Sequence, residues 1–468
     1  MSGQEWSLQA AGEVAEEALA ASVGDGCVVI VEDTSEAELR FALNSVTGNG
    51  VRRTRRVTVI SMIGRSGGLG VGSASSSGTG DPVELVRAAE VDAAAAEPAG
   101  DEFALVGPED SVARGALGPE PATTGIEALG GVISGLGPAL RRAEAGEYLV
   151  AGFASQEMST LTVATSAGLR LRHVQPTAKL ELTARADNGA RSAWVGAGSG
   201  DFSSVPLEEL EDKLVRRLSW ATRRVDLEPG RYEVLLPPEA VADLVLLAGE
   251  AASGRQAEEG RCVFSGPEGT TRLGEVISEK AFSLRSDPRE PGVECAPFLV
   301  SGASSEDVSV FDNGLALERT EWMAGGRLER LRYHRAGAAR SGRPVAPPID
   351  NLILELPGAT SSLDDMIAGS ERALLLTCLW YIREVDPVTL LVTGLTRDGV
   401  YLVENGEIVA AVNNFRFNES PIDVLARCTE VGRSERALSR EWNEWMSRTV
   451  MPPLRVAEFN MSSVSPAT

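Results

Sequence analysis

The sequence predicts an α+β protein with two halves: an N-terminal mixed α/β domain with antiparallel hairpins, residues 1–228, and a C-terminal β-rich, barrel-like domain, residues 229–468. A chain of 468 residues is too long for one ordinary hydrophobic core, so more than one domain is expected. Before residue 228, segments with helical periodicity are mixed with alternating, strand-like segments. After it, short strand-like runs separated by glycine turns dominate.

The first half opens with a helix and a hairpin. Apolar residues recur with the helical period over residues 5–21. Gly48-Asn49-Gly50 predicts the turn of a hairpin between strands at 38–45 and 51–62. Asp81 is a typical N-cap for a helix over 82–96. Three further strands and a closing helix are expected at residues 27–31, 170–183, 191–195 and 207–222.

A glycine-rich stretch precedes the helix expected at residues 82–96. Residues 67–72 depart from the G-x-G-x-x-G pattern, because Ser73 and Ser75 stand where a glycine is needed. We interpret the stretch as a flexible surface loop rather than a phosphate-binding loop.

The second half combines two helices with many short strands. The helices are expected at residues 239–252 and 362–371. The strands are expected at residues 232–236, 273–278, 314–323, 328–333, 351–356, 388–393, 399–403 and 407–412.

Charge and cysteine usage limit the partners and the compartment. The formal net charge is −23, so nucleic acid and anionic membranes are not expected as partners. The longest apolar stretches, such as residues 373–381, are too short to span a bilayer. The five cysteines are far apart, without a C-x-x-C pair, and residues 1–26 lack the pattern of a signal peptide. A reduced, cytoplasmic protein is therefore expected.

One concentrated basic run, residues 52–56 (RRTRR), interrupts this acidic chain. The simplest interpretation is a solvated hairpin strand. The alternative is a docking surface for an acidic partner or for peptide carboxylates.

Only two histidines are present, His173 and His334, and they are far apart in the chain. A helical zinc motif of the H-E-x-x-H or H-E-x-x-x-H type needs two imidazoles about one turn apart. No G-x-S-x-G nucleophile elbow accompanies them either, so each is expected to be a surface or structural histidine. We therefore expect no catalytic residue and no metal site in this chain.

Several segments, in order, resemble the TldD/PmbA family of metallopeptidases, also labelled modulators of DNA gyrase. Residues 38–47 (ELRFALNSVT) are similar to the family segment R-F-A-x-N-x-V-T, and residues 196–202 (GAGSGDF) to the turn before the helix that closes its first half. The most specific match is residues 399–408 (GVYLVENGEI), which resemble the family element G-x-x-x-x-E-N-G-E-I. Residues 452–456 (PPLRV) resemble a family ending.

This resemblance implies a subunit type. TldD-like chains carry H-E-x-x-x-H on a helix and a C-terminal cysteine ligand, whereas TldE/PmbA-like chains lack the motif and pair with a TldD-like chain. The corresponding helix here, residues 239–252, has no histidine, and neither Glu250 nor Cys428 could hold zinc alone. The chain therefore resembles the TldE/PmbA type.

The resemblance also implies a function. The chain would be the non-catalytic subunit of a heteromeric TldD/TldE-type zinc metallopeptidase that hydrolyses short or unfolded peptides. It would carry no cofactor of its own, with zinc held by the TldD-like partner of a heterodimer, and it would form part of the substrate chamber.

Polar residues within one stretch of the β-rich half are candidates for contacting peptide. Arginine and asparagine side chains can bind a peptide backbone independently of its sequence. Turn formation explains the same residue types equally well. The candidates are Arg383, Arg397, Asp398, Asn413, Asn414 and Arg416.

Two other functions remain open. The chain could be an amide or peptide hydrolase subunit dedicated to one specialised metabolite. It could also be a homodimer that binds peptides or a small molecule without hydrolysing them.

Overall fold

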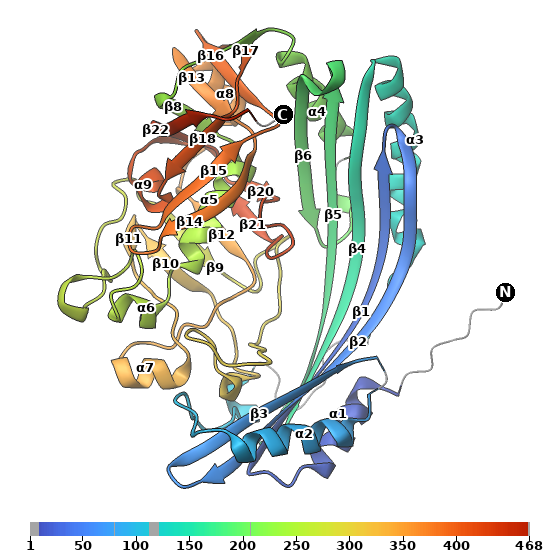
Figure 1. Cartoon of the computed structure of the whole chain (residues 1–468), viewed down its shortest axis with the longest axis vertical. Coiled ribbons are helices and arrows are strands. Elements are labelled where there is room, and N and C mark those ends of the chain that lie inside the picture. The colour runs from blue at the N-terminus through green and yellow to red at the C-terminus, as the bar shows by residue number, and fades with distance from the viewer. Residues whose placement is uncertain (1–8, 79, 112–120, 206, 467–468) are drawn as a thin grey trace, which may run out of the picture.

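The computed structural model describes residues 9–78, 80–111, 121–205 and 207–466. Three β-sheets organise these residues (Figure 1). The first sheet uses only residues before 200, and the other two use only residues from 224 onward. The predicted α+β class and the β-rich second half are therefore confirmed.

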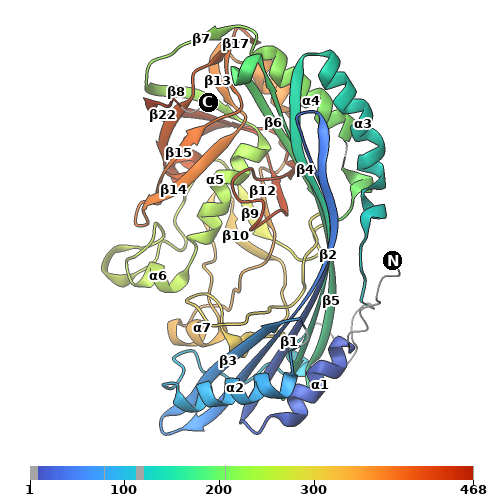
Figure 2. The same ribbon diagram turned by 45° about the vertical axis from the view of Figure 1, so that its right-hand side comes forward.

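A six-stranded antiparallel sheet in the spatial order β3-β2-β1-β4-β5-β6 forms the first half. Its strands are β1 (Gly26–Ala42), β2 (Ser45–Arg65), β3 (Gly68–Ser77), β4 (Tyr148–Thr165), β5 (Arg170–Ala186) and β6 (Arg191–Ser199). Four of these strands are unusually long and run side by side as one curved wall (Figures 1 and 2).

Four helices cover one face of this wall. They are α1 (Ala11–Ala21), α2 (Pro82–Ala95), α3 (Gly130–Ala145) and α4 (Leu207–Trp220). Val29 of β1 packs with α1 and α2, and Leu39, on the same face of the same strand, packs with α3 and α4. One pair of helices therefore lies at each end, and the opposite face is turned toward the second half of the chain (Figure 2).

The first hairpin turns earlier than predicted. Strand β1 continues to Ala42, and the turn is Leu43-Asn44, both with positive φ (51° and 58°). Asn44 tolerates this conformation, and its side chain also bonds to the neighbouring strand: Nδ2 donates to the carbonyl of Tyr148 and Oδ1 accepts from the amide of Val150. The expected turn residues 48–50 lie within β2, and the expected strands at 27–31 and 38–45 are one strand.

The glycine-rich residues 67–72 do not form a flexible loop. Most of them belong to strand β3, which lies against helix α2. A Cβ atom on Gly70 or Gly72 would come within 2.2 or 2.1 Å of a carbonyl oxygen of α2. The glycines therefore allow helix and strand to approach closely. The N-cap of α2 is confirmed, since the Asp81 carboxylate accepts a hydrogen bond from the amide of Val83.

The second half contains two sheets. The larger has the spatial order β14-β15-β18-β22-β8-β13-β16-β17-β7, with β19 paired to β22, and this path of strands does not close into a barrel. Its strands are β7 (Arg224–Val225), β8 (Gly230–Leu236), β13 (Arg372–Leu376), β14 (Leu379–Asp386), β15 (Leu391–Thr396), β16 (Val400–Glu404), β17 (Glu407–Val412), β18 (Phe415–Glu419), β19 (Cys428–Val431) and β22 (Leu454–Val464).

The smaller sheet has the order β11-β10-β9-β12-β21-β20. Its strands are β9 (Ser283–Ser286), β10 (Thr320–Ala324), β11 (Arg327–Leu328), β12 (Leu352–Glu355), β20 (Glu435–Ala437) and β21 (Thr449–Met451). The strand expected at 273–278 is irregular backbone with one isolated bridge, between Val276 and Arg327.

The helices of the second half are α5 (Pro238–Glu250), α6 (Gly254–Glu258), α7 (Arg335–Ser341), α8 (Leu363–Ala368) and α9 (Pro421–Ala426). Of these, α5, α8 and α9 pack against strands of the two sheets. Helix α5 is the most buried, and its apolar residues belong to the largest core cluster of the protein. None of the helices in the described chain combines the length and the apolar character needed to cross a membrane.

Candidate functional site

The face of the first sheet that is turned toward the second half changes from apolar to polar along its strands. At one end, Val28 and Ile30 of β1 pack against Phe298 and Phe311 of the second half. Further along the same face, Glu32 and Glu36 line a cavity instead. Because this polar stretch faces other parts of the protein across a gap, it is the best candidate for a binding surface.

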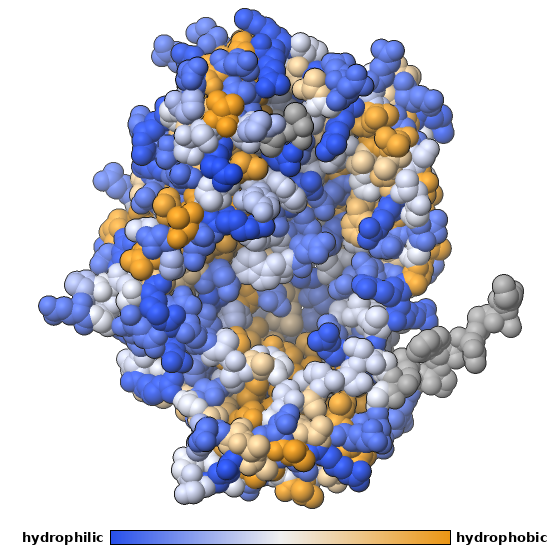
Figure 3. Space-filling model, in the orientation of Figure 1, coloured by the Kyte–Doolittle hydropathy of each residue, from blue (hydrophilic) through white to orange (hydrophobic). Residues whose placement is uncertain are grey.

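Two adjoining cavities of about 290 and 190 Å³ lie along this gap. Figure 3 shows the surface hollowed between the two halves. The cavities share four lining residues, His173, Gln175, Ser447 and Arg448. We call the two cavities together the interdomain recess. Its other charged lining residues are Glu32, Glu36, Glu157, Lys179, Glu294, Asp350 and Glu444.

Burial shifts the proton affinities of the groups in this recess. Burial, followed by repulsion from Glu36 and Glu32, raises the pKa of the Glu157 carboxyl. Desolvation by the surrounding protein raises the pKa of Asp350, although part of this residue is exposed, and burial lowers the pKa of Arg448; each of the two partly offsets the shift of the other. The recess therefore disfavours charged groups that are not paired, and it contains an excess of carboxyl groups over cations.

Two side chains fix the geometry of the recess. Arg448 donates a hydrogen bond through Nη2 to Thr177 Oγ1 on β5, so the segment that follows Trp445 is held against the first sheet. Nε2 of His173 lies 3.0 Å from Oε1 of Gln175, and burial lowers its pKa. His173 is thus a hydrogen-bonded structural histidine, which is one of the two roles expected from the sequence, and it also lines the recess.

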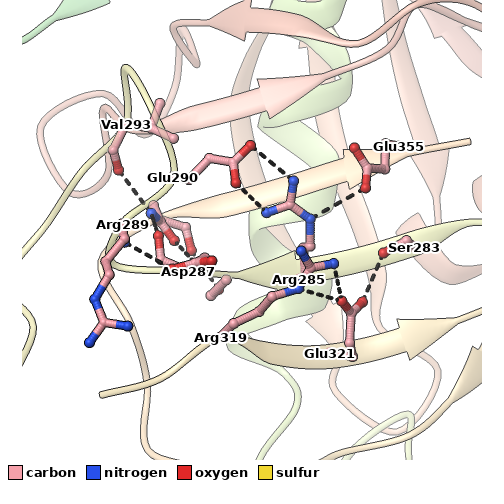
Figure 4. A network of polar contacts seen from close by, with 11 residues as sticks. Ser283, Arg285, Asp287, Arg289, Glu290, Val293, Arg319, Glu321 and Glu355 are labelled. Atoms are coloured by element: carbon pink, nitrogen blue, oxygen red, sulfur yellow. Dashed lines mark hydrogen bonds and ion pairs between the residues drawn. The ribbon is translucent and has the colours of Figure 1, made fainter. Parts of the chain in front are cut away.

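A network on strand β9 holds the loop that lines the smaller cavity (Figure 4). Arg285, which is almost fully buried, donates to both carboxylate oxygens of Glu290 at 2.6 and 2.9 Å and to Glu355 at 3.3 Å. These bonds raise the pKa of the guanidinium above its ordinary value. Gly292 and Val293, which line the recess, lie two and three residues after Glu290. The paired arginine therefore fixes one wall of the recess.

The structure brings two of the six sequence-predicted residues together. Arg383 on β14 is paired in register with Thr393 on β15, and Arg416 on β18 donates to Thr393 Oγ1 at 3.2 Å. Arg383 also bonds to Glu441 at 2.9 Å and lies over the ring of Tyr381. Both arginines are largely exposed on the outer face of the larger sheet.

The other four candidates lie elsewhere. Asn413 is buried, and its Oδ1 accepts a hydrogen bond from the amide of Leu227, which ties it to the segment between the two halves. Arg397 and Asp398 lie in the turn between β15 and β16, where Asp398 has a positive φ of 46°. The carbonyl of Asn414 accepts from the amide of Ser465. None of the six lines the interdomain recess.

The recess residues were missed by the sequence reasoning, although one signal was present. Glu32 and Glu36 are alternate residues of a strand whose other face is apolar, which indicates a polar face. The sequence does not show that another part of the chain lies across from that face. Asp350 and Arg448 come from that other part of the chain, and the residues around them in the sequence form no pattern that indicates a binding site.

Helix α5 uses its polar residues for structural contacts. Glu239 forms ion pairs with Arg217 at 2.5 Å and with Lys213 at 3.2 Å. Asp243 accepts hydrogen bonds through Oδ1 from Ser439 Oγ and from the amide of Glu441. Glu250 pairs with Arg332 at 2.9 Å. Each carboxylate of this helix is thus bound to another part of the chain, with only Oδ2 of Asp243 lacking a hydrogen-bond partner, and the helix has no histidine.

The remaining potential ligands are scattered. His334 is the N-cap of α7, with Nδ1 accepting from the amide of Gly337. Burial raises the pKa of the Cys428 thiol to about 12, so the thiolate that a metal requires is disfavoured. Within the described ranges, no three histidine, cysteine, aspartate or glutamate side chains form a group that could hold a metal ion. The residues present do not fit a zinc site.

The family models decide the assignment. Residues 229–463 match the PmbA/TldA metallopeptidase C-terminal domain, and residues 127–222 match the PmbA/TldA metallopeptidase central domain. The chain belongs to the TldD/PmbA family. The family resemblance found in the sequence is confirmed, and the absence of a metal-binding group among the described residues fits a member that lacks the H-E-x-x-x-H motif.

Solved structures of this family share the fold over nearly the whole chain. TldE from Thermococcus kodakarensis is 16% identical, covers 96% of this chain and 99% of its own, and has a TM-score of 0.77. A putative modulator of a DNA gyrase from Thermotoga maritima is 16% identical, with coverages of 93% and 95% and a TM-score of 0.73. A putative modulator of DNA gyrase from Bacteroides thetaiotaomicron is 15% identical, with coverages of 97% and 99% and a TM-score of 0.75. A search of curated proteins finds no match.

Proposed function

We propose that this chain is the non-catalytic, TldE-like subunit of a heteromeric zinc metallopeptidase that cleaves short or unfolded peptides. The observation that carries the proposal is helix α5, which has no histidine and whose carboxylates are all bound to other parts of the chain. Zinc and the hydrolytic chemistry would belong to a TldD-like partner. This chain would supply part of the wall of a peptide chamber.

The interdomain recess is the part of this chain that would contact the peptide. A peptide backbone offers donors to the carboxylates of Glu157 and Asp350 and acceptors to Arg448. A cytoplasmic location is part of the proposal, and it is supported by the five cysteines, which are all free and buried.

The partner experiment tests the proposal. The chain is purified alone and together with a family member of the same organism that carries H-E-x-x-x-H, and zinc content and cleavage of an unfolded casein-derived peptide are measured. We expect zinc and cleavage in the complex and neither in this chain alone. Cleavage at stoichiometric zinc by this chain alone would contradict the proposal.

The same assay tests the recess. Replacing Glu157 by Gln together with Arg448 by Ala in the complex should raise KM for the peptide by roughly tenfold with little change in kcat, because both the peptide contacts and the Arg448–Thr177 bond that shapes the recess are lost while the partner's hydrolytic groups are untouched. Glu407→Gln with Arg330→Ala, two exposed positions outside the recess, is the matched control. An unchanged KM in a normally folded recess variant would exclude the recess as a peptide contact.

That the six residues predicted from the sequence contact the peptide is a separate proposal. Arg383→Ala with Arg416→Ala, assayed in the same complex, would raise KM if the outer face of β14, β15 and β18 contacts peptide. If it does not, these arginines are surface residues of the sheet.

A further inference from the structure

Strand β2 has one edge without a partner over about half of its length. β2 pairs with β1 along one side, but β3 covers the other side only from Arg56 to Arg65. In the part of the chain that the structure describes, no strand pairs with the outer edge between Ser45 and Thr54. Long bare edges are rare in soluble proteins, because their free N–H and C=O groups pair with other chains.

The direction of the free backbone groups follows from one hydrogen bond. The carbonyl of Arg55 points to the outer side, since it accepts from the amide of Gly78. Alternate residues of a strand direct their N–H and C=O groups to the same side. Arg53, Val51 and Asn49 therefore present both groups to whatever lies beyond the edge.

The side chains along this edge indicate the chemistry of an occupant. β2 contains no acidic residue, and of its five arginines Arg52 and Arg53 lie on the free edge, with Arg55 and Arg56 directly beyond it. Arg52 and Arg55 form ion pairs with Glu36 and Asp33 of β1, but neither Arg53 nor Arg56 pairs with a described residue. Val46 and Val51 are about half exposed, at 51% and 48%. The edge thus combines free backbone groups, exposed apolar side chains and the charge of Arg53, with Arg56, opposite Glu32 of β1, directly beyond it, on a chain with a net charge of −23.

We propose that an extended strand with acidic side chains, supplied by the partner subunit, pairs with the outer edge of β2 at residues 45–54 and continues the first sheet across the subunit boundary. The inference rests on the proposed function, since it requires a partner subunit. Charge complementarity favours this occupant over a second copy of the chain, because a second copy would bring another strand without any acidic residue against the first. The basic run of the sequence would then be a docking surface.

Two variants of this chain test the pairing in the complex with the family member that carries H-E-x-x-x-H. Asn49→Pro removes an outward N–H that β1 does not use, and Asn49→Ala is its control because it keeps that N–H. Arg53→Glu with Arg56→Glu reverses the free charge, and Arg330→Glu is the control at an exposed arginine outside this edge. Each edge variant should weaken the affinity by roughly tenfold or more, whereas both controls should bind like the wild type.

Hydrogen exchange provides a second readout. In the complex the amides of Asn49, Val51 and Arg53 should exchange more slowly, while those of Gly50 and Arg52, which β1 already binds, should not change. A complex whose affinity is unaffected by the edge variants would overturn the pairing and leave the proposed function standing. No complex with the wild type would overturn both. If the chain forms a homodimer that the edge variants dissociate, the occupant of the edge is a second copy of the chain, and the proposed acidic strand of the partner subunit is wrong.

Discussion

Replacing Glu239 by alanine is expected to lower the free energy of unfolding by about 3–5 kcal/mol, which is typical when one member of a buried ion pair is removed. Glu239 on α5 is nearly buried, and Arg217 on α4, which bonds to it, is 1% exposed. Arg217 also donates to the carbonyl of Trp194 on β6. Without the carboxylate, Arg217 would remain as a buried cation without its ion-pair partner, and the partly exposed Lys213 would keep only the more distant Glu435. Urea unfolding of the purified chain measures the loss.

The Glu239 carboxylate also makes the stability of the protein depend on pH in the acidic range. Burial alone would raise the pKa of Glu239, but Lys213 and Arg217 outweigh it and hold the pKa at about 2. Because the folded value lies below that of the unfolded chain, the contribution is present above about pH 4 and is lost as the pH falls toward 2. Glu407→Ala, at an exposed position on β17, should leave this acid limb unchanged. A similar loss in both variants would contradict the role assigned to Glu239.

Asp243, one turn further along α5, should produce the opposite dependence. Burial raises its pKa to about 8, although hydrogen bonds from Ser439 and from the amide of Glu441 lower it in part. The folded protein therefore keeps a proton that the unfolded chain releases above about pH 4. This contribution is complete below that pH and is lost as the pH rises to about 8.

The variant Asp243→Asn, which cannot ionise, isolates this effect. Between pH 5 and 8 the stability of the wild type relative to the variant should fall by about 1.4 kcal/mol for each pH unit, the value for one proton. Parallel urea titrations at several pH values measure the slope. Identical slopes for the two proteins would show that Asp243 is ionised in the folded protein at neutral pH.

Both residues lie on helix α5, which the family resemblance equates with the metal-binding helix of TldD-like chains. The sequence predicted this helix and its lack of histidines, because both are local properties. It did not predict that Glu239 and Asp243 attach the helix to α4 and to the segment at residues 439–441, since these contacts join residues that are distant in the chain.

The same distinction explains the other successes and errors. The N-cap Asp81 was predicted because a cap acts within its own turn. The hairpin turn was misplaced because Gly48-Asn49-Gly50 is a good local turn signal, whereas the contacts of Asn44 with β4 come from another part of the chain. The glycines at 70 and 72 were interpreted as flexible because the sequence does not show helix α2 lying against them.

The great length of the central strands affects how the first half unfolds. The ladder between β4 and β5 runs without a register shift from Tyr148 to Ala164, which corresponds to about 50 Å at roughly 3.3 Å per residue. The layer of α1 and α2 and the layer of α3 and α4 are therefore fixed to the same continuous set of hydrogen bonds. If one pair of helices unfolds, it exposes the apolar face of strands on which the other pair also packs. The two ends of the sheet should therefore unfold together rather than as separate units.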